Sequence, residues 1–200
     1  MYDLPHHKEN DPDVVREFIG RYPLATLIGC DAEQHPVATQ IPVFVEAVDG
    51  REVLRGHFMR KTDHHRAFEQ NKNALVLFTG PNCYVSGTWY SNPQTASTWN
   101  YMTGQVRGVL RFLDEAGLVD ILRKTTLHFE DGNTDSETIF DNLPPDYTNK
   151  LLPAIVAFEI EIETLDTVFK LSQDRDHESY KNIIRELRQQ GGDAEVIAEE

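Results

Sequence analysis

The chain has 200 residues, of which 40% are hydrophobic and 10% aromatic, which is ordinary for one globular domain of this length. Its formal net charge of -14 at pH 7 opposes direct binding to nucleic acid or to an anionic membrane, because no long Lys/Arg run provides a local basic patch. No apolar run is long enough to span a bilayer or to form the core of a signal peptide, and we therefore expect a cytoplasmic protein.

The first half of the chain predicts one helix, then strands, then a second short helix. Asp11 and Pro12 are typical of a helix start, with Asp as the N-cap and Pro at the first helical position. Strands are predicted over residues 24–30, 36–48 and 52–58, and Asp49-Gly50 forms the hairpin turn between the last two. Thr62 or Asp63 then caps a helix that runs to about residue 71.

The second half predicts four strands and two longer helices. The strands cover residues 74–79, 84–90, 98–113 and 154–171, and the helices cover residues 114–129 and 176–190. Between them, residues 131–146 are acidic and turn-rich, with one short helix around residues 137–142 and a helical turn at 147–152. Gly191-Gly192 closes the terminal helix.

The strand over residues 154–171 has the clearest period in the chain. Apolar residues alternate with Ala157, Glu159, Glu161 and Glu163, which predicts a half-buried strand with one solvated acidic face. About seven strands, mostly connected as hairpins, argue against a parallel βαβ sheet. The predicted fold class is mainly β, an antiparallel barrel with peripheral helices, because closure removes exposed strand edges.

Four segments carry residues that could take part in chemistry. Residues 39–43, TQIPV, could contact a ring edge, or they form a barrel strand whose proline marks an edge or bulge. Residues 169–175, FKLSQDR, are a candidate whose alternative is a helix-start loop. The other two are residues 56–64 and residues 80–101. Residues 56–64, GHFMRKTDH, place cations where a strand ends and a helix begins, an arrangement that favours an anion such as phosphate; a solvated basic turn is the alternative. Residues 80–101 contain both tryptophans and three tyrosines among hydroxyls and amides, which suits a planar ligand with polar edges; an aromatic β-core is the alternative.

Other chemistry has little support in the sequence. There is no GxSxG, HExxH or P-loop motif. The adjacent pairs His6-His7 and His64-His65 diverge on any regular backbone, so neither predicts a metal site. Cys30 and Cys83 lie outside metal-binding spacings, which favours two reduced, buried thiols.

Several strings along nearly the whole chain resemble the PaiB-like FMN-binding negative transcriptional regulators. They stand in the family's order as MYDLPHH, ATQIPV, LRGHFMRKTDHH, VLFTGPNCYVSGTWY, STWNYMTGQVRGVLR, AIVAFEIEIE and FKLSQDR. The resemblance implies a split barrel of the pyridoxamine-phosphate-oxidase type, in one domain over residues 1–200. A helical excursion at about 114–152 and a C-terminal helix at about 176–190 would complete it.

The resemblance also implies a homodimer with FMN at the subunit interface. By resemblance, the FMN phosphate and ribityl chain would meet His57, Arg60, Lys61 and Thr62. The flavin ring would lie along the strand that carries Thr39 and Gln40 as polar contacts. The residues that would line the ring, part of them from the partner subunit, are Trp89, Tyr90, Thr98, Trp99 and Asn100.

The chain departs from the family's usual His-x-Ala-[Arg/Lys]-Ala-Asn-Pro string after His57. Met59, Lys61, Thr62 and Asp63 stand in its last positions, which weakens the assignments at Thr62 and Asp63. The resemblance assigns no role to Lys170, Gln173 or Arg175 in the last string.

Three functions fit the sequence and the resemblance. The first is a flavin-binding negative regulator of transcription that senses flavin or a small molecule and acts indirectly, since no helix-turn-helix with a basic second helix is visible. The second is an FMN-dependent oxidoreductase or flavin reductase that uses a nicotinamide cofactor. The third is a split-barrel protein that binds haem through a histidine.

Overall fold

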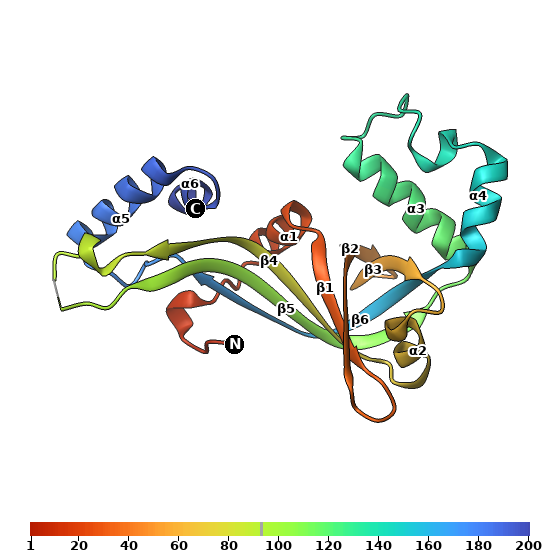
Figure 1. The fold of residues 1–200 in the computed structure, drawn as a ribbon, viewed down its shortest axis with the longest axis horizontal. Helices are drawn as coiled ribbons and strands as arrows, with labels where there is room; N and C mark the ends of the chain where they lie inside the picture. Colours follow the sequence, from red (N-terminus) through yellow and green to blue (C-terminus); the bar gives the residue numbers. More distant parts are fainter. Residues whose placement is uncertain (93) are drawn as a thin grey trace. The chain divides into compact units, whose positions relative to one another are not determined.

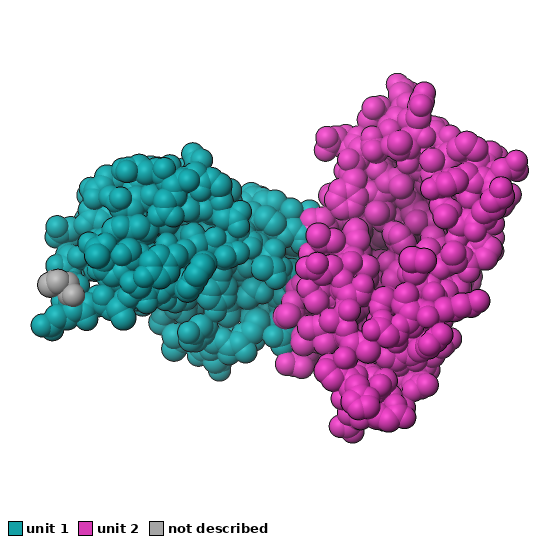
Figure 2. All heavy atoms as spheres, in the orientation of Figure 1, with its two compact units in different colours: residues 1–22, 78–105, 166–200 teal, residues 23–77, 106–165 magenta. Residues whose placement is uncertain are grey.

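The computed structural model describes residues 1–92 and 94–200. The chain divides into two compact units: residues 1–22, 78–105 and 166–200 form unit 1, and residues 23–77 and 106–165 form unit 2 (Figure 2). Three strands contribute residues to both units. The prediction of a single domain over residues 1–200 stays a prediction.

Six antiparallel strands form a closed barrel in the order β1-β2-β3-β6-β5-β4 (Figure 1). The strands are β1 (Leu24–Cys30), β2 (Pro36–Val48), β3 (Arg51–Met59), β4 (Asn73–Val85), β5 (Thr98–Phe112) and β6 (Ile155–Lys170). The barrel predicted from the hairpin pattern is therefore confirmed. Asp49 and Gly50 both have positive φ, 50° and 75°, as a tight hairpin turn of the type I′ kind requires.

One predicted pair of strands is a single strand in the structure. Residues 74–79 and 84–90 were expected to be separate, but β4 runs without a break through Gly80, and the chain after Val85 forms a short 3-10 helix, η2 (Gly87–Trp89). A Cβ on Gly80 would meet the Phe18 ring at 2.6 Å, so the glycine serves close packing rather than a turn.

Strand β2 changes its pairing partner at Pro42. Residues 36–42 pair with β1, and residues 43–48 pair with β3. Pro42 has no N–H to donate, and Val43 donates instead to the Pro23 carbonyl at 2.8 Å. The proline therefore marks the point where the ladder is interrupted, as a proline in a barrel strand predicts.

The helices of unit 2 are α2 (Asp63–Gln70), α3 (Glu115–Phe129), η3 (Phe140–Asn142), α4 (Pro145–Leu151) and η4 (Leu152–Ala154). Helix α3 packs against β3 and β6, and helix α2 packs against β1 and β2. Leu118 and Ile121 of α3 pack against Ala157 of β6 in one core cluster. As a result β6 is buried on both faces from Val156 to Ile160.

The prediction of a fully solvated acidic face on β6 is wrong at Ala157 and Glu159. Only 3% of Glu159 is exposed, because its carboxylate lies between two arginines: Arg55 Nε donates to Oε2 at 2.8 Å and Arg111 Nε donates to Oε1 at 2.9 Å. Glu161 and Glu163 are exposed, as predicted.

Unit 1 holds the N-terminal and C-terminal helices. They are η1 (Pro5–His7), α1 (Pro12–Arg21), η2, α5 (His177–Gln190) and α6 (Asp193–Glu199). The Asp11 side chain caps α1 by accepting from the Asp13 N–H, as predicted. Helix α6 was not predicted: Gly191 and Gly192, with φ of 70° and 58°, end α5 and turn the chain into one more helix.

Two further sequence predictions concern burial and membranes. Both cysteines are free thiols; Cys83 is buried, whereas Cys30 is only half-buried, so the expected burial holds for Cys83 alone. Burial raises the pKa of the Cys83 thiol to about 11. Within the described residues, no helix has both the length and the apolar character needed to cross a membrane.

Candidate functional site

The turn between β3 and α2 carries three exposed cations, Arg60, Lys61 and Arg66, which we call the β3–α2 basic group. Arg60 Nε donates to the Ile155 carbonyl at 2.9 Å, which anchors the side chain on β6. Among the described residues, none of the three cations lies within 4.0 Å of a carboxylate. These charges are therefore available to an anionic ligand.

The start of α2 is capped by its own side chains. Thr62 Oγ1 accepts from the His65 N–H at 3.3 Å and donates to the Met59 carbonyl at 3.0 Å, and Asp63 Oδ1 accepts from the His64 N–H at 2.7 Å. The backbone N–H groups of the first turn are thus largely paired. An anion at this turn would be held mainly by cationic side chains, and the Thr62 contact stays a prediction.

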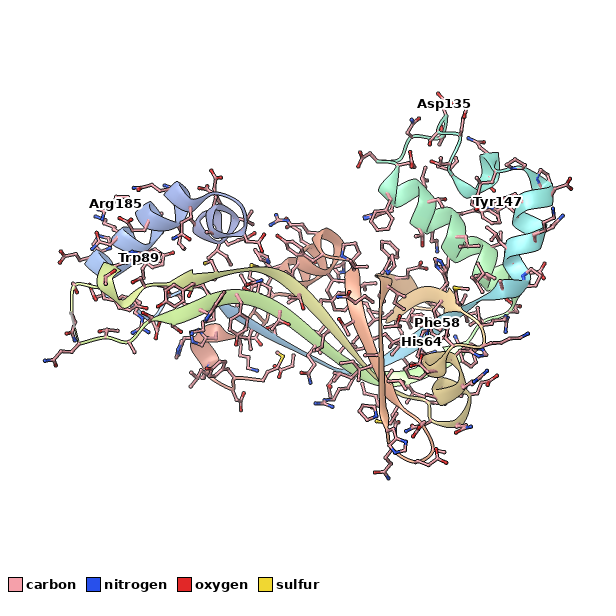
Figure 3. The ribbon with its side chains drawn as sticks, viewed as in Figure 1. Phe58, His64, Trp89, Asp135, Tyr147 and Arg185 are labelled. Carbon is pink, nitrogen blue, oxygen red and sulfur yellow. The ribbon has the colours of Figure 1, made fainter. Side chains whose placement is uncertain are left out.

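His57 and the two histidines of α2 differ in their surroundings. Burial lowers the pKa of His57, and its Nδ1 is buried with no hydrogen-bond partner among the described residues. His64 packs edge-on against Phe58 with ring centroids 5.0 Å apart (Figure 3), and both of its ring nitrogens contact polar side chains. Burial, and then the positive charge of Arg60, lower the pKa of His65 against the opposing effect of Glu69.

Thr39 and Gln40 lie on the part of β2 that pairs with β1, opposite Leu27 and Thr26. Thr39 is half-buried and Gln40 is exposed. Both side chains therefore reach solvent at least in part, and their contact with a ligand stays a prediction.

The aromatic segment belongs to unit 1, and its predicted contacts split into two layers. Trp99 is 54% exposed and meets Tyr84 edge-on at 5.9 Å, and Trp89 of η2 is half-buried (Figure 3). Tyr90 and Asn100 lie in the interior, with 7% and 0% exposed. Thr98 is half-buried and accepts a hydrogen bond from Lys170.

The structure thus brings Arg60, Lys61 and Thr62 together at one turn, directly after the strand that carries His57. Thr39 and Gln40 lie in the same unit, and the five predicted residues of the aromatic segment lie in unit 1. Sequence reasoning missed the polar residues that surround Asn100 and Tyr90, although FKLSQDR was noticed as an unusual string. Its Ser172 has a positive φ of 64°, which no pattern in the sequence signals.

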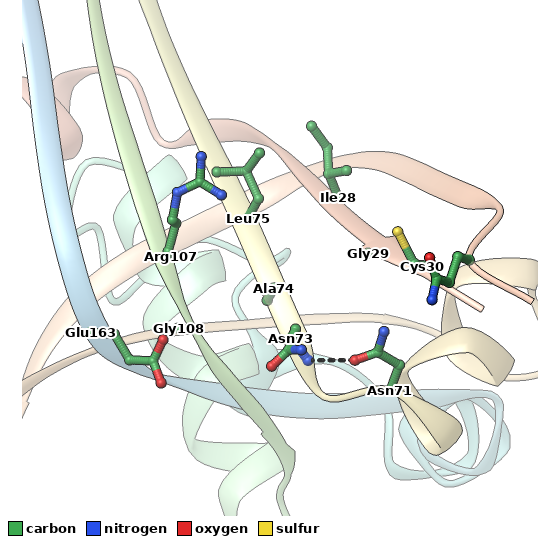
Figure 4. Close-up of a pocket in the computed structure, with 11 residues that line it drawn as sticks. Ile28, Gly29, Cys30, Asn71, Asn73, Ala74, Leu75, Arg107, Gly108 and Glu163 are labelled. Atoms are coloured by element: carbon green, nitrogen blue, oxygen red, sulfur yellow. Dashed lines mark hydrogen bonds between the residues drawn. The ribbon is translucent and has the colours of Figure 1, made fainter. Parts of the chain in front are cut away.

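Unit 2 also contains a cavity of about 740 Å³ that includes none of the predicted contacts (Figure 4). Cys30, Asn71, Asn73, Arg107 and Glu163 are among its lining residues, and Asn71 Oδ1 accepts from the Asn73 N–H at 3.1 Å. Gly108 forms part of the wall; a Cβ there would lie 2.0 Å from the Glu161 carbonyl oxygen. The polar and apolar groups mix without an excess of either charge.

The residues present fit FMN. Its phosphate is an anion for which the β3–α2 basic group is chemically suited. The buried, unpartnered Nδ1 of His57 lies on the strand that leads to this group, and an unpaired buried polar atom is rare unless it serves a ligand, a water or a strained state. Exposed indole and phenol rings in unit 1 suit a flat apolar ring.

Comparison with known proteins agrees with this chemistry. The family model described as "Putative FMN-binding domain" matches residues 1–164. The chain is 28% identical over 200 residues to the "Protease synthase and sporulation protein PAI 2" of Bacillus subtilis, covering 100% of this chain and 95% of that protein. It is 24% identical over 233 residues to the uncharacterized protein AN0679 of Emericella nidulans, covering 97% and 93%.

Solved structures share the fold. The "FAD and Heme binding protein" of Mycobacterium smegmatis matches with a TM-score of 0.62 at 20% identity, over 82% of this chain and 73% of that one. The "Flavocytochrome Anf3" of Azotobacter vinelandii matches with a TM-score of 0.62 at 16% identity, over 90% and 78%. Because the family model covers residues 1–164 and the relative from Bacillus subtilis matches the whole chain, the chain belongs to the PaiB-like FMN-binding family, with FMN as its cofactor and the split barrel as its fold.

Proposed function

We propose that the β3–α2 basic group holds the FMN phosphate and that the protein is a flavin-dependent negative regulator of transcription. The observation that carries the site is the set of three exposed cations that, within the described residues, form no ion pair within 4.0 Å, in a chain whose net charge is -14. Cations left unpaired in a strongly acidic protein are best explained by an anionic ligand.

Each predicted contact has a role in this proposal. Arg60 supplies a planar fork for phosphate oxygens, and its bond to the Ile155 carbonyl orients that fork. Lys61 adds a second positive charge, and His57 Nδ1 is available to the ribityl chain. Thr62 would contact FMN only by sharing a hydroxyl that already caps α2.

The flavin ring is proposed to lie along Thr39 and Gln40 of β2. The family resemblance assigns the indoles of Trp89 and Trp99 to the lining of a flavin ring, part of which would come from the partner subunit. When bound, FMN supplies reversible transfer of a hydride or of single electrons. The indoles would shield one face of the ring from water, while Gln40 would contact its polar edge. Tyr90, Thr98 and Asn100 would act from behind this layer, because they are buried or already hydrogen-bonded.

A homodimer in the cytoplasm, with FMN at the subunit interface, is part of the proposal and is supported by family membership. The regulatory role is supported by the relation to the sporulation protein of Bacillus subtilis. The net charge of -14 makes an indirect effect on transcription, through flavin or a small molecule, more favourable than direct DNA binding.

An absorption spectrum of the purified protein, recorded after adding FMN and removing the excess, tests the cofactor. Flavin bands at one FMN per chain that are released on denaturation support the proposal, and no retained flavin contradicts it. Steady NADH or NADPH oxidation by the loaded protein would favour an oxidoreductase over a regulator. A Soret band on titration with haemin, in place of flavin, would favour a haem-binding protein.

Arg60→Ala tests the phosphate contact. Loss of a charge-assisted hydrogen bond should weaken FMN binding by about 1.5–3 kcal/mol, measured by the quenching of flavin fluorescence at matched salt. Arg51→Ala is the control, because Arg51 is exposed at the opposite end of β3 and pairs with Glu161. Equal FMN affinity of Arg60→Ala and the parent would show that the phosphate is held elsewhere.

A further inference from the structure

Unit 1 contains a group of buried polar atoms that make no hydrogen bond of good geometry, although the Tyr90 hydroxyl interacts with the Arg175 side chain and His7 interacts with Gln173. Within the described residues these are His7 Nδ1, Tyr90 Oη, Asn100 Nδ2 and Arg175 Nε. Only 3% of His7, 7% of Tyr90 and none of Asn100 is exposed. Buried donors without partners are costly, and so many in one half of a small protein call for a physical explanation.

These residues come from four separate segments that meet in unit 1. His7 ends η1, Tyr90 follows η2, Asn100 lies on β5, and Arg175 follows β6. The Arg175 guanidinium carbon lies 5.0 Å from the centroid of the Tyr90 ring. Lys170 belongs to the same neighbourhood: it donates a hydrogen bond to Thr98, two residues before Asn100, and its charge acts on His7. We call His7, Tyr90, Asn100, Lys170 and Arg175 the donor cluster.

Hydrogen bonds hold the segments in place without filling the free donor positions. Ser172 Oγ donates to Asn100 Oδ1 at 2.9 Å, which uses the amide oxygen and leaves Nδ2 unpaired. Gln173 Nε2 donates to the His6 carbonyl at 2.7 Å and joins the N-terminal segment to the segment after β6. The arrangement is therefore fixed by other contacts, and the unpaired donors are positioned rather than loose.

Donors predominate in the donor cluster. Asn100 Nδ2, Arg175 Nε and the Lys170 ammonium can only donate, whereas the Tyr90 hydroxyl and the His7 imidazole can each donate or accept. Burial, followed by the nearby charge of Arg175, lowers the pKa of Lys170, as expected for two cations held close together. What the cluster lacks is an acceptor that carries negative charge.

The acids of unit 1 near the donor cluster do not supply that acceptor. Asp174 is exposed, and its Oδ1 lies 3.7 Å from Arg175 Nε, beyond hydrogen-bond distance. Asp176 already accepts from the Ser179 N–H at 3.0 Å and from the Ser91 hydroxyl at 3.2 Å. Asp174 thus balances part of the charge without completing any donor.

We propose that the donor cluster is a second ligand site, which binds the oxyanion of a small molecule, a carboxylate or a phosphate. Lys170 and Arg175 are only half-buried, so the cluster reaches the surface through them. The oxyanion takes the place of Asp174 beside Arg175 and accepts from Asn100 Nδ2 and the Tyr90 hydroxyl. This site goes beyond the proposed FMN function, and it adjoins the proposed ring site, because Tyr90 and Asn100 are also proposed to lie behind the layer of indoles.

Calorimetric titration of the full-length protein tests the site. Potassium succinate and potassium phosphate are the probes, each at constant ionic strength set with potassium chloride. We expect saturable binding of at least one probe, and the stronger one identifies the source as carboxylate or phosphate. Binding of neither probe overturns the proposal.

Two substitutions should shift the affinity in opposite directions. Lys170→Met removes a charge-assisted contact and should weaken binding about tenfold or more. Asp174→Asn removes the competing negative charge and should tighten binding several-fold. Arg185→Met is the control, because Arg185 is an exposed cation on α5 that contacts Glu186.

If Lys170→Met does not fold, the surface substitution Asp174→Asn still tests the oxyanion site. Affinity that is unchanged or weaker in Asp174→Asn overturns the proposal. Arg60→Ala separates the two sites: it should weaken FMN binding and leave the affinity for the probe as in the parent. Loss of probe binding in Arg60→Ala, with no change in Asp174→Asn, would place the oxyanion at the β3–α2 basic group and also overturn the proposal.

Discussion

The molecule contains two buried polar clusters of opposite character. In unit 2, Glu159 lies between Arg55 and Arg111, and Arg55 also contacts Glu46 at 3.2 Å. In unit 1, the donor cluster holds cations and donors that have no such counterpart. Each cluster has a buried centre and reaches the surface through a cation, yet only the first is complete within the chain.

The difference separates a structural cluster from a binding one. Burial by itself would raise the pKa of Glu159, but the hydrogen bonds and charges of Arg111 and Arg55 hold it below its ordinary value. A carboxylate stabilised in this way needs nothing further from outside the chain. Donors that remain unpaired after folding are groups for which a ligand can provide the missing partner.

Glu159→Ala gives the largest expected effect. It leaves Arg55, which is largely buried, without its main partner, and breaking a buried ion pair from one side costs about 3–5 kcal/mol. Because the Arg111 side chain is 63% exposed and can turn to water, we expect a loss near the lower end of that range. Urea unfolding followed by circular dichroism measures the free energy of unfolding.

Glu161→Ala is the matched control for this prediction. Glu161 lies on the same strand and pairs with Arg51 at 3.2 Å, but both side chains are about two-thirds exposed, 66% and 67%. Exposed pairs contribute about 0–1 kcal/mol. Similar losses in both variants would mean that Glu159 is not the centre of a distinct buried cluster.

Much of the barrel could be predicted because its signals are local. Helix caps at Asp11 and Thr62, the Asp49-Gly50 turn and the proline at the partner change of β2 each depend on a few neighbouring residues. The Glu159 pairing could not be predicted in the same way. The alternating pattern of β6 predicts a solvated face. Glu159 is buried because α3 packs on this strand and because arginines from β3 and β5 pair with its carboxylate.

The candidate site was predictable to a different degree. Similarity of whole strings to a known family, rather than periodicity, selected the residues around the β3–α2 turn. Similarity to the family assigned no role to Lys170 or Arg175. The residues that these two side chains contact lie about 70 to 165 positions away along the chain. Whether a buried donor finds a hydrogen-bond partner therefore depends on tertiary contacts, which no sequence pattern predicts.

Ser172→Ala should have an intermediate effect and test how the donor cluster is held. Ser172 is 2% exposed and donates to Asn100 Oδ1, so its loss leaves the buried amide without either hydrogen bond. An unsatisfied buried group costs about 1–3 kcal/mol in the free energy of unfolding. Ser97→Ala, which removes an exposed hydroxyl that accepts from the Gly87 N–H, should cost less. Equal stability of Ser172→Ala and the parent would mean that Asn100 finds another acceptor or donor.

The smallest expected effect is a pH dependence that distinguishes the two clusters. Burial, and then the neighbouring His6, hold the pKa of His7 below its ordinary 6.5. The unfolded chain therefore takes up a proton first as the pH falls, so stability that is present above pH 6.5 is lost below it. Glu159, with a pKa below its ordinary 4.5, keeps its full contribution above pH 4.5 and loses it as the pH falls from there through the lowered pKa. His7→Gln should thus lose less stability than the parent between pH 7 and pH 5, by up to about 1 kcal/mol in urea unfolding.

Burial also lowers the pKa values of His57 and His65, but these two histidines act equally in both proteins and cancel in the difference. The same pH profile in parent and variant would contradict the assignment of this titration to unit 1.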